Sequence, residues 1–498
     1  LILSMAMNIH ISVRYLQFKK ENPNVSNRDA ILWTSGKMFW PILYTVLTTI
    51  CAFLSLIFSG IKPIIDFGWM MTLGLLVSLT VTFTLLPAIL SLLSKTNLKF
   101  EGDKKSKITS FLSEVAKKNT KTIFISTILV VIISVIGILK LEVENSFINY
   151  FDKETEIYKG MKLIDDKLGG TTPLSVIIKF PEKEIEKNED DEFDSWDDEE
   201  NDDAKYWFTR NKIDKITKIH DYLDSLEGVG KVISFASMVR VAEDLNDGKK
   251  LQGLEMGVLY TKIPDSIKKG IIDPYISIKN NEARVNLRIV DSQENLRRNE
   301  LVNKINYDLE NKLGLNKEEF KLAGVLILFN NLLQSLFKSQ ILTLGVVMAG
   351  ITTMFLILFR NITLSIIGVV PNFMAAFLIL GIIGLLEIPL DMMTITIAAI
   401  TIGIAVDNSI HYIYRFKEEF KKTNNYNQTL DKCHDTVGVA ILNTSITIIF
   451  GFSILVLSNF IPTIYFGVFT GIAMLLAMIS VLTLLPKLIL VAKPFGNE

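Results

Sequence analysis

The chain has 498 residues, of which 49% are hydrophobic, and its mean hydropathy is +0.36. This composition excludes an ordinary soluble globular protein and indicates several membrane-spanning segments. The formal net charge is −1 and there are only two cysteines, so we expect neither a nucleic-acid partner nor a disulfide framework.

The first part of the chain is predicted to be the end of a helical bundle, residues 1–94. Residues 1–15 form a partial span, and apolar runs at 41–60 and 67–94 are long enough to cross a bilayer. Because the sequence begins at Leu1 and without a signal peptide, we interpret it as the C-terminal part of a longer protein. A basic linker, 95–120, and a further span, 121–140, follow.

The lysines and arginines predict the orientation of these spans. They are concentrated in three segments, 14–37, 95–121 and 415–432. Positive loops stay on the cytoplasmic side, and counting spans from any of the three gives the same topology. We therefore expect a multi-pass protein of the cytoplasmic (inner) membrane, with residues 141–338 on the extracytoplasmic side.

Residues 141–338 are predicted to form an α+β domain. Strands are expected at 174–180, 231–235, 283–290 and 320–325, with helices at 208–226 and 294–313. The order gives two βαβ units, which we expect as two small subdomains side by side. The stretch 182–205 holds fourteen acidic residues against two lysines between Glu182 and Asp203, so it is interpreted as a disordered insert. A calcium site there is a weaker alternative, because the stretch has no EF-hand-like spacing.

A second bundle, 339–491, is predicted from spans at 339–359, 362–386, 391–415, 438–457 and 464–491, followed by a cytoplasmic tail, 492–498. Asp407 lies inside the third of these spans. A carboxylate at that depth is costly and usually marks an ion or proton path. Asp391 and Glu387 lie at the outer loop where this span starts, and both are expected to be solvated.

The two bundles resemble each other in sequence. Thr45, Ser59, Pro63, Phe67-Gly68 and Leu85-Leu86-Pro87 recur at a constant offset of 399 as Thr444, Ser458, Pro462, Phe466-Gly467 and Leu484-Leu485-Pro486. His10 and Arg14 recur at an offset of 401 as His411 and Arg415. Parallel repeats of this kind are typical of transporters.

The motif Gly403-Ile-Ala-Val-Asp407-Asn-Ser-Ile-His411, with Arg415, Pro371 and Ile388-Pro-Leu-Asp391, carries a family resemblance. The chain resembles RND-superfamily transporters of the MMPL, or hydrophobe exporter, type, which have sterol-sensing-domain-like membrane bundles. The resemblance implies mostly helical RND-type bundles, one truncated and one complete, with a porter-like α+β domain. It also implies proton-driven export of a hydrophobic or lipidic molecule.

The candidate proton relay consists of Asp407, His411, Thr444 and Ser445. Residues four apart share one helix face, so Ala399, Gly403, Asp407 and His411 form a stripe whose small members allow close helix packing. The resemblance implies that the helix carrying Thr444 packs beside the Asp407 helix. Asp407 could instead be a structural carboxylate, His411 a helix-end histidine, and the two hydroxyls could bond within their own helix.

One position departs from the family pattern, because the repeat places Ala6 where Asp407 has its counterpart. Either Asp407 works alone, or proton coupling is lost. Two alternatives to export therefore remain: a lipid- or sterol-sensing membrane protein, and a protein-export auxiliary. No enzyme motif, metal-ligand spacing or cofactor motif is recognised. The resemblance implies a homo-oligomer, either a dimer or a trimer.

Overall fold

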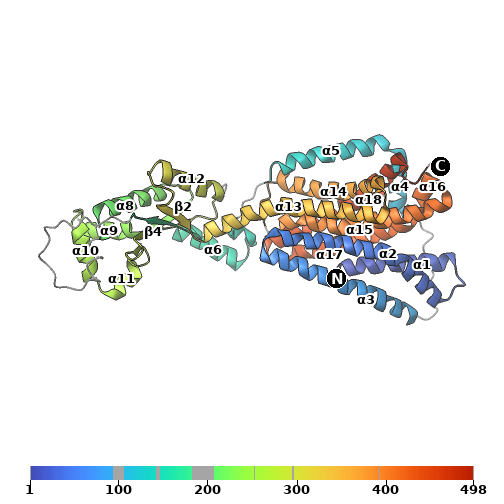
Figure 1. Cartoon of the computed structure of the whole chain (residues 1–498), viewed down its shortest axis with the longest axis horizontal. Helices are drawn as coiled ribbons and strands as arrows, with labels where there is room; N and C mark the ends of the chain where they lie inside the picture. The colour runs from blue at the N-terminus through green and yellow to red at the C-terminus, as the bar shows by residue number, and fades with distance from the viewer. Residues whose placement is uncertain are drawn as a thin grey trace. The chain divides into compact units, whose positions relative to one another are not determined.

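The computed structural model describes residues 2–92, 106–141, 146–181, 207–251, 253–293, 296–391 and 393–496. The predicted acidic insert 182–205 lies outside these residues. The chain divides into two compact units (Figure 1). The first comprises residues 1–145 and 334–498, here called the bundle unit, and the second comprises residues 146–333, here called the α+β unit.

The bundle unit is helical. Its helices are α1 (Ile2–Glu21), α2 (Asn27–Ser55), α3 (Lys62–Leu92), α4 (Lys107–Lys118), α5 (Thr120–Ile138), α13 (Val325–Phe359, whose first residues belong to the other unit), α14 (Ile362–Leu385), α15 (Thr394–Thr423), α16 (Tyr426–Cys433), α17 (Val439–Ser453) and α18 (Ile461–Ala492). Short turns at Leu56–Ser59, His434–Gly438 and Ile454–Leu457 extend them.

Eight helical segments among the described residues are long and apolar enough to cross a membrane. They overlap the eight predicted spans, so the long apolar helices that were predicted are present. Several are longer than their apolar cores, since α2 starts at Asn27 and α15 continues to Thr423. The second half of the predicted basic linker is itself helical, as α4, which packs against α16 and α18.

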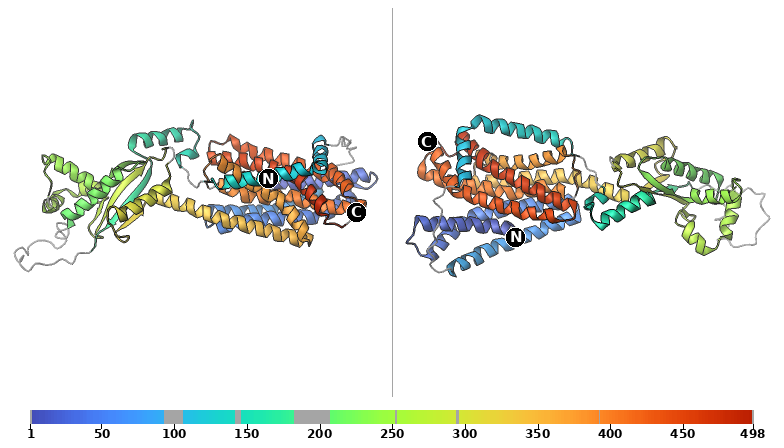
Figure 2. Two further views of the ribbon diagram at one scale, coloured as in Figure 1. Left: turned by 90° about the horizontal axis from the view of Figure 1, so that it is seen from above. Right: turned by 180° about the vertical axis from the view of Figure 1, so that it is seen from behind.

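The two repeats pack crosswise. Helix α15 of the second repeat contacts α2 of the first, and α1 of the first contacts α17 of the second. Figure 2 shows α1–α3, in blue, lying along one side of the orange helices α14–α18. At another contact, between α5 and α14, a Cβ added at Gly137 would overlap the backbone of Gly381, so these two backbones touch directly.

The α+β unit contains one antiparallel sheet. Its strands are β1 (Thr172–Lys179), β2 (Val229–Ile233), β3 (Ile276–Ser277), β4 (Glu282–Ile289) and β5 (Phe320–Ala323). The strand order is β2-β4-β1-β5, with β3 paired to β4. The helices are α6 (Glu156–Leu168), α8 (Arg210–Asp224), α9 (Phe235–Leu245), α10 (Gly253–Lys262), α11 (Asp265–Ile271) and α12 (Arg298–Asn311), with a short turn at Ile148–Tyr150.

All four predicted strands are present, but their arrangement differs from two subdomains side by side. The units β1-α8-β2 and β4-α12-β5 interleave in one sheet, as in the split βαβ, ferredoxin-like arrangement. The physical reason is burial. Strand β4 alternates buried and more exposed positions, and its inward residues share one core with α8 and α12. Two separate two-stranded layers could not bury that face.

A buried polar cluster ties the start of this unit to its sheet. Asp165 accepts hydrogen bonds from the backbone N–H groups of Asp291 (3.0 Å) and Ser292 (2.7 Å). The Asp291 carboxylate in turn accepts from Arg298 (2.6 Å) and from the Ser146 hydroxyl (2.6 Å). Because these buried groups pair with one another, the cluster fixes α6 and α12 relative to the strand ends.

Candidate functional site

The helix that carries Asp407 begins at a buried acid. Asp391 is 2% exposed, and its Oδ1 accepts hydrogen bonds from the backbone N–H groups of Met393 and Thr394, both at 2.8 Å. The expectation that Asp391 is solvated is therefore wrong, while Glu387 is exposed as predicted. A carboxylate near a helix start satisfies the free N–H groups of the first turn, which explains why this acid can be buried.

Helix α15 approaches α2 closely one turn from Asp407. A Cβ added at Gly403 would overlap the Cβ of Ala52, and the Thr49 hydroxyl donates to the Gly403 carbonyl at 3.0 Å. Ala399 is fully buried one turn further along. The small-residue stripe of α15 thus faces the first repeat at Gly403, and Asp407 follows it at the same interface.

Three titratable side chains meet beside this contact. The rings of His10, from α1, and His411, from α15, stack with their centroids 4.0 Å apart and their planes at 14°. His411 Nε2 lies 3.1 Å from Asp407 Oδ1, yet neither that oxygen nor His10 Nε2 has a partner with hydrogen-bond geometry. The His411–Asp407 contact is therefore electrostatic rather than an aligned hydrogen bond.

The hydroxyls near Asp407 differ from the predicted pair. Thr45 of α2, the repeat counterpart of Thr444, lies near the Asp407 carboxylate, but its hydroxyl donates to the carbonyl of Ile42 in its own helix at 2.9 Å. Thr444 itself donates to the carbonyl of Ile441 in its own helix at 3.0 Å. Ser445 accepts a hydrogen bond from Asn408, at 3.3 Å, rather than contacting the acid. The structure thus brings Asp407 and His411 together and leaves Thr444 and Ser445 outside the group.

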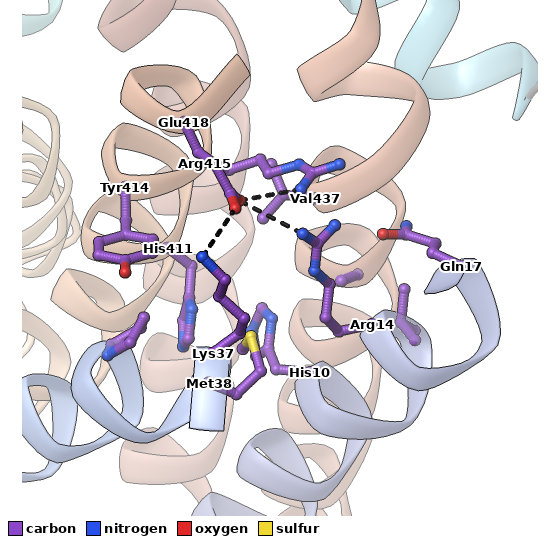
Figure 3. Close-up of a pocket in the computed structure, with 13 residues that line it drawn as sticks. His10, Arg14, Gln17, Lys37, Met38, His411, Tyr414, Arg415, Glu418 and Val437 are labelled. Atoms are coloured by element: carbon purple, nitrogen blue, oxygen red, sulfur yellow. Dashed lines mark hydrogen bonds and ion pairs between the residues drawn. The ribbon is translucent and has the colours of Figure 1, made fainter. Parts of the chain in front are cut away.

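Charged side chains from both repeats surround the entrance to the histidine pair. Glu418 of α15 accepts from Arg14 of α1 at 3.3 Å and from Arg415 at 3.0 Å, and Lys37 of α2 lies 3.9 Å away. Figure 3 shows Arg14, Lys37 and Arg415 converging on this carboxylate, with His10 and His411 beneath. A cavity of about 50 Å³ lies between these groups and the two histidines. Charged and imidazole groups line part of this cavity, so a water molecule there would find hydrogen-bond partners.

The same three side chains have the donor types of a metal site. One ligand atom each of His10, Asp407 and His411 lies within 4.8 Å of the others. Imidazoles around a zinc ion radiate from it, whereas these two rings are stacked. The arrangement fits proton exchange better, because carboxylates and imidazoles titrate and the cavity beside the two histidines is large enough for water.

His10 is the residue that the sequence reasoning did not place in the site. The sequence feature that could have indicated it is the repeat, which pairs His10 with His411 at an offset of 401 residues. If the two repeats are related by an axis between α1 and α15, equivalent residues near that axis must meet, as the stacked rings do.

The fold and this site define a multi-pass membrane protein of the RND type, with repeated helical bundles and an α+β domain. The profile of the MMPL family matches residues 14–122 and 217–496. The chain belongs to the MMPL family, as its motifs predicted.

A membrane protein and a solved structure are also similar to this chain. A membrane protein of the archaeon Methanocaldococcus jannaschii is 24% identical over 390 residues, which are 77% of this chain and 94% of the relative. The hedgehog release protein Disp from the water bear Hypsibius dujardini has a similar structure, with a TM-score of 0.60 and 14% identity. That similarity covers 98% of this chain but spans only 62% of the Disp chain, and it concerns the fold alone.

Proposed function

We propose that this protein is a transporter that exports a hydrophobic or lipidic molecule at the expense of a proton gradient. The observation that carries the proposal is the Asp407 carboxylate, which has an oxygen without a hydrogen-bond partner and lies against stacked His10 and His411. Asp391, a buried acid with a structural role, accepts hydrogen bonds from two backbone N–H groups instead. An acid that exchanges protons must keep a position open.

The relay that we propose is a single site built from both repeats. Ala6 is buried and supplies no second acid, but α1 contributes His10 to the Asp407 site. Protons enter through the cavity beside Glu418, pass to the histidine pair and reach Asp407. His411 and His10 then share the role that a second carboxylate would have had, so loss of the first acid does not require loss of coupling.

The basic segments support an orientation in which the α1–α2 turn, α4 and α16 face the cytoplasm. The α+β unit is then extracytoplasmic, and the Glu418 cavity opens toward the cytoplasm. The family membership and the fold shared with a hedgehog release protein support export of a hydrophobic substrate rather than an enzymatic role. A homodimer or homotrimer in the membrane stays a prediction.

The proposal is tested by Asp407→Asn, with Asp391→Asn as the matched control. Both acids lie on or beside α15, and an asparagine at 391 can still accept the N–H bonds that start the helix. Gradient-dependent efflux of the lipophilic dye Nile red is measured in cells that express each variant at equal level. We expect efflux to be lost in Asp407→Asn, reduced in His10→Ala and unchanged in Asp391→Asn.

A second measurement does not depend on the dye. Acid titration of the purified protein, followed by infrared spectroscopy, should show the carbonyl band of a protonated carboxyl that is missing in Asp407→Asn. Efflux that continues in Asp407→Asn at the wild-type rate would refute proton carriage by this residue. It would then favour the lipid-sensing alternative, which needs no titrating acid in the membrane.

A further inference from the structure

The α+β unit contains an apolar cavity that the proton site does not use. Its volume is about 250 Å³, and it lies among the end of the segment before α8 and helices α9, α10 and α11. All fifteen described side chains that line it are hydrophobic, and they include Phe208, Phe235, Val239, Met256, Leu259 and Ile271. Tyr260 contributes the one hydroxyl among them.

The cavity is open to solvent because the helices around it are buried on the sheet side only and keep apolar side chains exposed on the other. The start of α9 is held at the sheet by a capping box at Ser234, so its inner residues Phe235 and Val239 join the core. Toward its end, Val241 is 58% exposed and Leu245 is 84% exposed, and both line the cavity. Clustered apolar side chains that remain exposed mark a binding surface.

The size and chemistry of the cavity restrict its occupant. A dry cavity of ~150 Å³ binds one benzene ring, whereas pockets for drug-sized ligands start at ~300 Å³. A volume of about 250 Å³ therefore takes one segment of a slender, flexible hydrocarbon chain, whereas a rigid fused four-ring sterol does not fit within it. A polar ligand would lose its hydrogen bonds to water and find only the Tyr260 hydroxyl among the described side chains.

We propose that this cavity binds a single unbranched acyl chain of a lipid or fatty acid, with the polar head group left in water. The chain would cover the lining side chains that α9, α10 and α11 leave exposed, which include Leu245 and Leu259. That the bound lipid is also the exported substrate rests on the proposed function. Binding itself does not depend on the membrane site, because every lining residue belongs to the α+β unit.

Two neighbouring positions on α10 provide a matched pair of variants. Leu259 lines the cavity and is 45% exposed, whereas Val258 does not line it and is 44% exposed. An asparagine at either position costs the fold little, because both side chains already reach water. Only Leu259→Asn puts an amide against the bound chain. A second variant, Ala242→Trp, fills the cavity from α9.

The experiment uses the whole chain in lipid nanodiscs and a fatty acid that carries a photoactivatable diazirine in its chain. Peptides labelled after illumination are identified by mass spectrometry. We expect labelling within 235–272 that unlabelled palmitate removes and cholesterol does not. Labelling should fall at least tenfold in Leu259→Asn and Ala242→Trp and stay unchanged in Val258→Asn.

Two further measurements are added. One separates this inference from the proposed function, and the other identifies the source of the bound acyl chain. Asp407→Asn should label like the wild type, so binding persists even if proton coupling fails. A phosphatidylcholine with the same diazirine chain shows whether the occupant comes from a membrane lipid or a free fatty acid. The proposal would be overturned by labelling of the protein outside residues 235–272 or by competition from cholesterol as strong as that from palmitate. Full labelling of both cavity variants would also overturn it.

Discussion

Replacing Gly403 by alanine tests the close contact between α15 and α2 one turn from Asp407. The added methyl group would overlap the Cβ of Ala52, which is itself 2% exposed, so neither helix can simply move a side chain aside. The variant therefore perturbs the packing of the proton site without touching a titratable group. It also tests whether the two repeats pack crosswise.

The expected magnitude combines two opposing effects. Forcing an extra carbon into a packed interior costs ~1–3 kcal/mol. Alanine in place of glycine inside a helix gains at most ~1 kcal/mol. The net loss of stability for Gly403→Ala is thus about 0–2 kcal/mol. At Gly74, where an added Cβ meets nothing within 4 Å, only the gain applies, so the two variants should differ by ~1–3 kcal/mol.

The assay is thermal unfolding of the purified protein in detergent, together with dye efflux. A change of 1 kcal/mol shifts the midpoint by at most ~2–4 °C for a domain of this size or larger. Gly403→Ala should unfold earlier than Gly74→Ala, and Ala52→Gly added to Gly403→Ala should recover most of the difference. Equal midpoints for the two single variants, or no recovery in the double variant, would refute the contact.

The remaining predictions concern the buried polar cluster of the α+β unit. Arg298→Met leaves the Asp291 carboxylate buried without its guanidinium and should destabilise the protein by ~3–5 kcal/mol, and Asp291→Leu added to it should restore part of that loss in a denaturant titration. Burial acts to raise the pKa of Asp165, but hydrogen bonds from Ser292, the Asp291 N–H and Thr171 outweigh it and hold the pKa below its usual range. The stability that this acid contributes is therefore present above its unfolded pKa and lost as pH falls through its lower folded value, and Asp165→Asn should reduce that acid sensitivity.

Much of the membrane architecture could be predicted from the sequence, because spanning length and hydropathy are local properties. The depth of Asp407 and the repeat offsets were sufficient to predict two related bundles. Which threonine lies near Asp407 could not be predicted, since Thr45 and Thr444 occupy equivalent repeat positions and the same local pattern fits either helix. Only the packing of α15 on α2 brings Thr45 near the acid.

In the α+β unit, too, local sequence predicts the elements but not which elements pack together. The alternation in β4 predicts a strand with one buried face, and the structure confirms it. The identity of its neighbours depends on contacts distant in sequence, such as the pairing of Val176 with Val285. The cavity among α9, α10 and α11 was not predicted either, because it results from how three short helices meet rather than from any motif.

The cluster around Glu418 has a mechanical consequence. Arg14 and Lys37 come from the first repeat, whereas Glu418 and Arg415 come from the second, so one carboxylate joins the two halves at a single end of the bundle. The histidine stack and the Gly403–Ala52 contact join the same two halves deeper in the bundle. Any displacement of one repeat against the other would therefore break the ion pairs of Glu418 with Arg14 and Lys37 and disturb the proton site at the same time.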